Sequence, residues 1–340
     1  MDSNVSKNTN SHNFFKLEVK RKKLGISTKN LLKQELLLIL NSYQQKFDVQ
    51  IEQNYFASIL ENKISISNYK NQPAKHFRSI TSLTETKSVP IVYSCPIGLL
   101  LAANQSHALQ IIMQQIKQLV SNRENADLEL LSVLVEIEIV DRGWINFYLG
   151  SKFMAIWLEQ SLVWHQRAII NDRAFAKKEI CAWENTFTNL FPVQYIHARC
   201  CSLLNLAARE NLISLSDDSP WIVRPIPTKI FPWLDEQNTL WLTRLAERNL
   251  LQQLLIVADS WVEDISDREA CTESNRQWSK LAFNLSQATA IFLADCRFLG
   301  EVKQKYPPLA IARLGLIALV QLWLQRILGE KFGVAASKSM

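Results

Sequence analysis

The sequence reads FPVQYIHARCCSLL from Phe191 to Leu204. This stretch opens a segment, residues 191–213, in which apolar side chains recur three and four positions apart, as they do along one face of a helix. The same spacing recurs in further segments of the C-terminal half, at about 172–190, 237–260, 274–300 and 309–329. These segments predict an all-α helical bundle over residues 169–340, interrupted by a proline-rich connection from Ser214 to Asp235.

The N-terminal half mixes helix and strand signals. Residues 30–47 carry leucines at helical spacing, Pro96 stands where a first-turn proline belongs, and residues 152–168 predict a further helix. The run Leu128–Val140 is rich in β-formers and alternates toward its end, and Trp144–Leu149 follows it as a second predicted strand. We therefore expect a small α+β domain over residues 29–168, preceded by a disordered basic arm, residues 1–28. The fold class is mostly α.

The apolar run Leu309–Leu328 is long, but it contains Arg313, Gln321, Gln325 and Arg326. Polar side chains at these positions favour a buried amphipathic helix over a membrane span. No membrane partner is expected. The tryptophans of the C-terminal half are interpreted as core and helix-end packing rather than as stacking platforms: Trp221, Trp233, Trp241, Trp261, Trp278 and Trp323.

The net charge of +6 is concentrated at the N-terminus. Residues 1–33 hold eight basic and two acidic side chains, a sum of +6, so the other residues sum to zero. The cluster Lys20, Arg21, Lys22 and Lys23 is a candidate RNA-binding element, because each phosphate neutralised adds affinity. A solvated tail is the alternative for this cluster. The neutral remainder favours a protein partner instead, because nucleic-acid surfaces usually show a basic excess.

The six cysteines lie in apolar contexts without C-x-x-C or Cys/His spacing, which predicts buried reduced thiols and neither a metal site nor a cofactor. The N-terminus lacks the apolar core of a secretory signal. A cytoplasmic location is expected, and an organellar transit peptide within residues 1–13 and the basic residues after them is the alternative.

Three parts of the sequence carry a family resemblance. Val193–Ser202 resembles the V-Q-Y-x-H-A-R-x-x-S run that opens the DALR anticodon-binding domain of arginyl-tRNA synthetases. Ala312–Leu316, followed by Leu328-Gly329 and a final Met340, resembles the end of that domain. Val135–Leu149 resembles the V-E-I-A-G-x-G-F-I-N-x-x-L run of the N-terminal additional domain in the same family, with Asp141 in place of a family glycine.

The resemblance implies a bundle like the anticodon-binding domain of class I synthetases and tRNA as partner, with arginine tRNA preferred. It makes RNA-contact candidates of six residues: Asn146, Gln194, Tyr195, His197, Arg199 and Arg313. For three of them a structural role is the alternative. His197 would be a buried helix residue, Tyr195 a core residue, and Arg313 a partner in an ion pair, for example with Asp295.

The family's catalytic domain has no counterpart here. Residues 166–184 alone separate the two resembling parts, where the family has a nucleotide-binding domain of some hundreds of residues. The sequence contains no H-x-G-H, no K-M-S-K-like loop, no P-loop and no G-x-G-x-x-G. We therefore predict a non-catalytic tRNA-binding protein, which presents tRNA to a modifying enzyme or regulates its use. The alternatives are a protein-interaction scaffold that has lost RNA binding and a trans-acting subunit of a synthetase in arginyl-tRNA aminoacylation.

Overall fold

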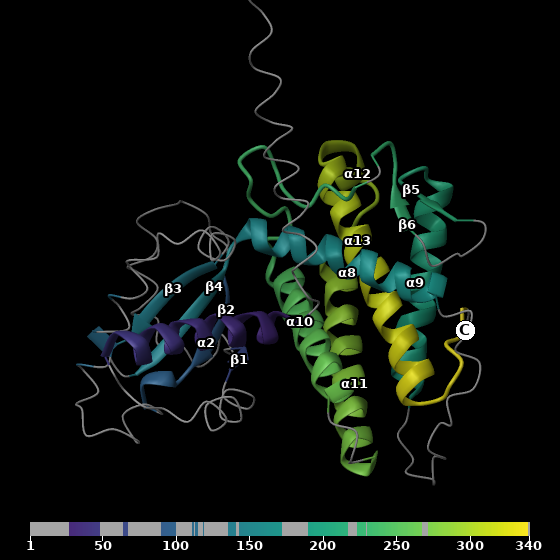
Figure 1. The fold of residues 1–340 in the computed structure, drawn as a ribbon. Helices are drawn as coiled ribbons and strands as arrows, with labels where there is room; N and C mark the ends of the chain where they lie inside the picture. Colours follow the sequence, from purple (N-terminus) through teal and green to yellow (C-terminus); the bar gives the residue numbers. More distant parts are fainter. Residues whose placement is uncertain are drawn as a thin grey trace, which may run out of the picture. The chain divides into compact units, whose positions relative to one another are not determined.

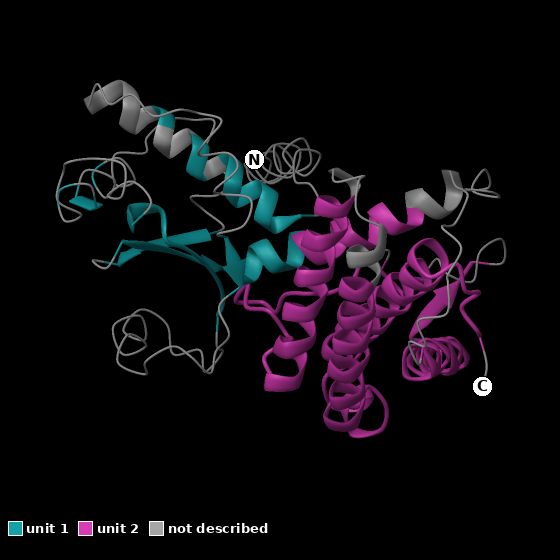
Figure 2. Cartoon of the chain, turned by 90° about the horizontal axis from the view of Figure 1, so that it is seen from below, with its two compact units in different colours: residues 1–86, 90–156 teal, residues 87–89, 157–340 magenta. Residues whose placement is uncertain are grey.

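The computed structural model describes the following residues: 27–47, 64–66, 90–99, 111, 113–114, 118, 135–140, 143–171, 190–216, 223–228, 230–266 and 271–338. The chain divides into two compact units, residues 1–86 with 90–156 and residues 87–89 with 157–340 (Figure 2). Helices predominate over a small sheet, so the expected mostly-α class is confirmed. The basic cluster Lys20–Lys23 and the predicted helix 172–190 lie outside the described residues, save Leu190.

Unit 1 contains a four-stranded antiparallel sheet in the order β1-β2-β4-β3 (Figure 1). Its elements are α2 (Thr28–Phe47), β1 (Ser65–Ile66), β2 (Ile91–Cys95), β3 (Val135–Val140), β4 (Trp144–Leu149) and the start of α8 (Ser151–Asn171). The Ser27 hydroxyl accepts a hydrogen bond from the Asn30 N–H at 3.1 Å and so caps α2. Gly143, with φ 85°, lies in the turn between β3 and β4.

Strand β2 ends directly before Pro96 and is an element that the sequence pattern did not predict. All five residues of β2 are buried, and the strand pairs with β1 on one side and β4 on the other. A short run buried on both faces shows no alternation, so its pattern cannot be told from that of a buried helix.

Unit 2 is helical apart from one small ladder. Its elements are the rest of α8, α9 (Phe191–Arg209), β5 (Ile213–Leu215), β6 (Val223–Pro225), α10 (Leu245–Ser266), α11 (Cys271–Asp295), α12 (Glu301–Lys305), α13 (Pro307–Arg326) and the π-helical turn η3 (Ile327–Lys331). Helix α9 packs against α13 and α11, and α10 packs against α11. The expected helix 237–260 begins only at Leu245. Asp235 Oδ1 accepts the N–H groups of Gln237 and Thr239, which holds that stretch in a turn.

Helix α13 is the axis of unit 2. Every residue from 310 to 324 is buried, so the helix is enclosed all round rather than amphipathic, which corrects the sequence expectation. By length and composition Pro307–Lys331 is apolar enough to cross a membrane, but 83% of its apolar window lies buried inside the protein. Gly315 lets the ring of Trp233 pack closely, because a Cβ at this position would stand 2.3 Å from it.

Candidate nucleic-acid interface

Helix α9 separates its side chains sharply into an inner and an outer face. The inner face is buried and packs into unit 2. The outer face is a single stripe that runs the length of the 19-residue helix, about 28 Å. We call this the outer stripe of α9, and its residues are Phe191, Tyr195, Arg199, Ser202, Leu206 and Arg209, all of them exposed. Among the described residues these side chains therefore form one exposed line along the helix.

Two aromatic rings form one end of the outer stripe. The rings of Phe191 and Tyr195 are stacked, with centroids 6.2 Å apart and an interplanar angle of 21°. Phe191 is 60% exposed and Tyr195 is 46% exposed. Exposed, parallel rings offer a flat surface on which an unpaired base can stack. Tyr195 is thus not a core residue, and Phe191 is a member of the site that the sequence interpretation missed.

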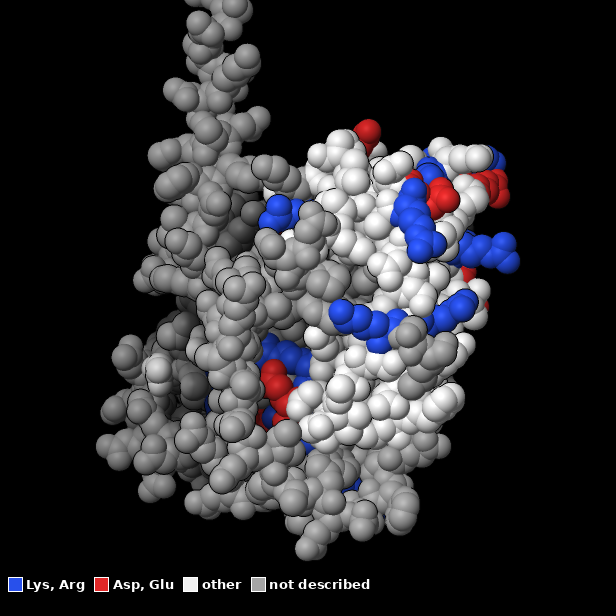
Figure 3. Space-filling model, turned by 90° about the vertical axis from the view of Figure 1, so that its right-hand side faces the viewer, with Lys and Arg blue, Asp and Glu red and all other residues white. Residues whose placement is uncertain are grey.

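Arginines continue the outer stripe beyond the rings. Arg199 lies one helical turn after Tyr195, and Arg209 ends the helix. Among the described residues neither arginine makes an ion pair. Figure 3 shows the side of the molecule on which α9, β5 and β6 lie, with several basic side chains on its described surface and acidic side chains beside some of them. This arrangement suits phosphate binding beside the rings. Gln194 is half-buried at the edge of the stripe.

His197 lies on the inner face of α9 and is fully buried. Its Nδ1 is 2.8 Å from the carbonyl oxygen of Ser337, and its Nε2 is 3.1 Å from the amide nitrogen of Gln321 on α13. The carbonyl only accepts, so Nδ1 donates and the neutral ring accepts at Nε2. His197 therefore occupies a buried position between α9, α13 and Ser337, as its structural alternative describes.

Cys201 lies beside this ring, with Sγ 3.9 Å from each ring nitrogen. Burial raises the pKa of the Cys201 thiol to about 11, although nearby Lys338 lowers it. The thiol is therefore protonated near neutral pH and is not an activated nucleophile. The four cysteines that the structure describes in full are buried and free, as expected: Cys95, Cys200, Cys201 and Cys296.

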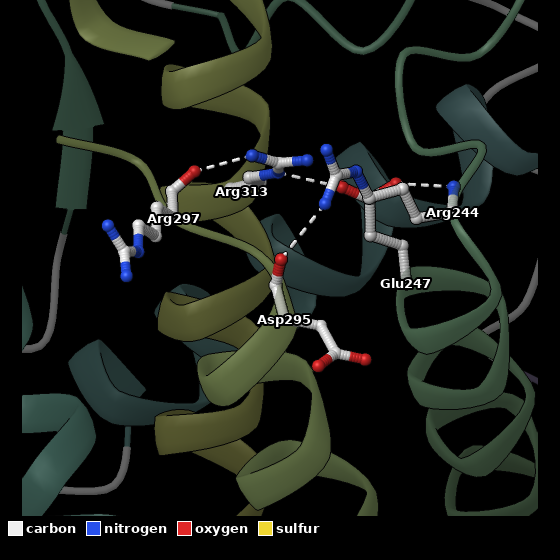
Figure 4. A network of polar contacts seen from close by, with 5 residues as sticks. All are labelled: Arg244, Glu247, Asp295, Arg297 and Arg313. Carbon is white, nitrogen blue, oxygen red and sulfur yellow. Dashed lines mark hydrogen bonds and ion pairs between the residues drawn. The ribbon is translucent and has the colours of Figure 1, made fainter. Parts of the chain in front are cut away.

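Arg313 is only 2% exposed and forms a buried ion pair. Its Nε donates to Glu247 Oε1 at 2.7 Å, and its NH1 donates to the Arg297 carbonyl (Figure 4). Glu247 Oε2 accepts the Arg244 N–H at 2.8 Å. The structural alternative of the sequence interpretation thus holds, with Glu247 as the partner. Asp295 was the partner suggested from sequence. Its backbone carbonyl instead accepts a hydrogen bond from the Arg244 guanidinium at 3.0 Å.

Asn146 belongs to unit 1 and joins three strands. Its Oδ1 accepts from the Ser94 hydroxyl at 2.8 Å, and its Nδ2 donates to Glu138 at 3.2 Å. The Tyr148 hydroxyl donates to the same carboxylate, and burial together with Glu138 raises the pKa of Tyr148. A network centred on a carboxylate attracts no phosphate. Asn146 is therefore a cross-strand structural residue in this arrangement.

Within the described part of the chain, no group of three or more His, Cys, Asp or Glu side chains is arranged to hold a metal ion.

Lowering the pH below about 6.5 is expected to destabilise the protein through two histidines. Burial lowers the pKa of His165 well below its usual 6.5, with Arg326 adding to the effect, and burial also lowers the pKa of His197. The folded state favours both neutral rings, so their stabilisation is complete above 6.5 and is lost as the pH falls toward the folded pKa values. Each contributes a slope of up to about 1.4 kcal/mol per pH unit. Urea unfolding at pH 7.5, 6.5 and 5.5 measures this change in the free energy of unfolding with pH.

The control for this pH effect is His165→Phe, which keeps a ring against Trp164 and Trp323 but cannot titrate. The variant is expected to show a shallower loss of unfolding free energy between pH 6.5 and 5.5. Identical slopes for the wild type and this variant would show that His165 does not set the dependence.

Comparisons with known proteins add one sequence relationship. No family model matches the chain, and no solved structure matches it. The chain is 30% identical over 129 residues to an arginine–tRNA ligase from Gloeobacter violaceus. The match covers 38% of this chain and 18% of that ligase, so the chain spans far less than the whole enzyme. This identity supports a distant relationship to the synthetases and hints at a tRNA-related function.

Proposed function

We propose that this chain is a non-catalytic tRNA-binding protein that contacts RNA through the outer stripe of α9. The observation that carries the proposal is the stacked, exposed Phe191–Tyr195 pair in line with Arg199, which lacks an ion-pair partner among the described residues. Rings that stack unpaired bases and an arginine that binds the adjoining phosphate are the two contacts that single-stranded RNA requires. The match to an arginine–tRNA ligase supports tRNA as the RNA and an arginine tRNA as the preferred one.

The absence of catalysis is part of the proposal. The sequence lacks the H-x-G-H and K-M-S-K motifs that would place imidazoles and lysines on a nucleotide's phosphates. The buried Cys201–His197 pair offers no substitute, because its thiol has a raised pKa. The chain would therefore hold tRNA for another protein, such as a modifying enzyme or a synthetase, or regulate the use of that tRNA.

Replacing both Tyr195 and Arg199 with alanine is expected to weaken tRNA binding about ten- to a hundredfold, because base stacking contributes about 1–3 kcal/mol per base and a phosphate contact is lost as well. The salt dependence of log Kd should also fall by about one unit of slope for the lost arginine contact. Titrations of total tRNA at two salt concentrations, followed by sequencing of the retained tRNAs, measure the affinity, the slope and the preference for arginine tRNA.

The matched control replaces an exposed aromatic and an exposed arginine elsewhere in unit 2. Arg276→Ala with Phe283→Ala on α11 removes the same two kinds of side chain, Phe283 being 49% exposed. This variant is expected to bind like the wild type. Equal losses in the two double variants, or binding that disappears only when residues 1–25 are deleted, would assign the RNA contacts to other parts of the chain.

One observation favours the protein-interaction alternative. Phe283 and Ile291 lie two turns apart on the same side of α11, and both are exposed. Exposed apolar side chains in line are typical of a protein contact. Under this alternative, the α11 variant above would lose a protein partner in co-purification, while the α9 variant would keep it.

A further inference from the structure

The chain turns back on itself after α13. The Val334 N–H donates to the Leu328 carbonyl at 2.9 Å, and Phe332 is buried, so the turn is anchored at its start. From there the segment Gly333–Lys338 runs beside α9 (Figure 1). It is held to that helix at Ser337, which is 140 residues from His197 in sequence. The fold thus lays a short terminal segment against the inner side of the helix that carries the outer stripe.

The imidazole of His197 connects the segment Gly333–Lys338 to two helices. His197 Nδ1 donates to the Ser337 carbonyl at 2.8 Å, while Nε2 accepts from Gln321, whose amide also donates to Gln325 at 3.1 Å. The ring therefore joins α9, α13 and the terminal segment through two hydrogen bonds. The bond to Ser337 uses a backbone carbonyl, so it depends on the path of the segment and not on the side chain at position 337.

Cys201 lies beside this contact. Its thiol lies against His197, one helical turn further along α9, and Lys338 stands near enough to lower its pKa. Burial is nevertheless the dominant influence on the pKa of this thiol. The reactivity of Cys201 therefore reports whether the terminal segment is in place.

We propose that Gly333–Lys338 is a latch that His197 closes against α9, and that opening the latch uncovers Cys201 and loosens the seating of α9 on α13. His197 is then a positioning residue for the outer stripe, a part of the inference that rests on the proposed function. The latch itself does not depend on RNA.

Replacing His197 with phenylalanine is expected to open the latch, because the ring volume is kept while the bond to Ser337 is lost. One hydrogen bond contributes about 0.5–1.5 kcal/mol, so Cys201 should be alkylated about two- to tenfold faster. His197→Asn should restore most of the protection, since its amide N–H stands close to the position of Nδ1. Removing residues 336–340 should speed alkylation as His197→Phe does, without touching α9. Peptide mapping of the iodoacetamide-treated protein gives the rate for each cysteine.

Cys296 is the internal control, because it is buried in the same unit but lies beside Glu247 and not beside the latch. A faster rate at Cys201 with an unchanged rate at Cys296 supports the latch. Parallel increases at both cysteines would indicate general loosening and overturn it. An unchanged Cys201 rate in the truncated protein would also overturn it.

RNA binding separates the two proposals. If His197 positions the outer stripe, His197→Phe should raise the Kd for tRNA about two- to tenfold, and His197→Asn should restore it. If alkylation follows the prediction while Tyr195→Ala/Arg199→Ala leaves tRNA binding intact, the proposed function fails and the latch stands. If the outer stripe binds tRNA while Cys201 protection ignores His197 and the terminal residues, the latch fails and the proposed function stands.

Discussion

Replacing Glu247 with alanine is expected to lower the free energy of unfolding by about 3–5 kcal/mol, because it leaves the guanidinium of Arg313 buried without a counter-charge. Arg313 has no route to solvent, since it is 2% exposed on a helix whose neighbouring positions are all buried, and Glu247 is 0% exposed. The carboxylate also accepts the Arg244 N–H, so a second donor would lose its partner. Urea unfolding followed by circular dichroism measures the loss.

Two further variants keep this prediction open to refutation if Glu247→Ala does not fold. Glu247→Gln retains a hydrogen-bond acceptor for Arg313 but removes the charge, so it should lie between the wild type and the alanine variant. Glu247→Leu combined with Arg313→Met removes both charges and should recover much of the stability. A loss below about 1 kcal/mol for Glu247→Ala would place the pair among solvent-screened contacts. In none of the folded variants should tRNA affinity change, because Arg313 lies inside the bundle.

The two arginines that carried the family resemblance show what sequence patterns can decide. On α9 the buried residues Val193, Ile196, Cys200 and Leu204 fix the phase of the helix, and that phase alone puts Arg199 outside and His197 inside. On α13 apolar residues surround Arg313 on every side of the helix, so the sequence pattern does not show which side faces inward. Its partner, Glu247, is 66 residues away, and only tertiary packing brings the two together. Outward residues were thus predictable on α9, and the role of Arg313 was not.

The elements show the same division between local and tertiary information. Strands β3 and β4 were predictable, because alternation and the glycine turn between them are local signals. The predicted helix ended at residue 213, whereas α9 ends at Arg209 and β5 begins at Ile213. The local signal for this end is Asn211, with φ 56°, because an asparagine tolerates the left-handed conformation that stops a helix. The start of α10 depended on bonds that Asp235 makes and on the pairing of the Trp241 N–H with the Trp233 carbonyl, 3.0 Å apart, which periodicity does not reveal.

The tryptophans of unit 2 form a core in which cations take part. Trp261, Trp278 and Trp323 are buried, as the packing interpretation predicted, and Trp233 is buried as well, whereas Trp221 lies outside the described residues. The guanidinium carbon of Arg326 lies 4.1 Å from the Trp164 ring centroid, and the Lys331 ammonium lies 4.4 Å from that of Trp261. The charged groups themselves lie over the ring faces, as in cation–π contacts, and both side chains are largely buried.

Replacing Trp323 with alanine is therefore expected to cost about 3–5 kcal/mol of unfolding free energy. The Trp323 ring is fully buried, lies 5.8 Å from Trp164 and 5.6 Å from Trp261, and meets His165 edge-on at 4.5 Å. Its removal leaves a large cavity where α8, α10 and α13 meet. Urea unfolding gives the magnitude, and loss of the near-ultraviolet circular dichroism of the stacked rings locates the change.

Trp241→Ala is the matched control, because Trp241 is half-buried and its indole donates to the Leu234 carbonyl at 3.1 Å. Trp241→Ala should lower the free energy of unfolding by less than Trp323→Ala, since solvent fills part of the vacated space. Trp323→Phe should retain more stability than Trp323→Ala, because a ring still meets Trp164 and Trp261. Gln321 lies two positions before Trp323 on α13, and its amide donates a hydrogen bond to His197 on α9. Damage to the tryptophan side should therefore speed alkylation of Cys201 and Cys296 together. Faster alkylation of Cys201 alone, with an unchanged rate at Cys296, would contradict the placement of Trp323 at the centre of the bundle.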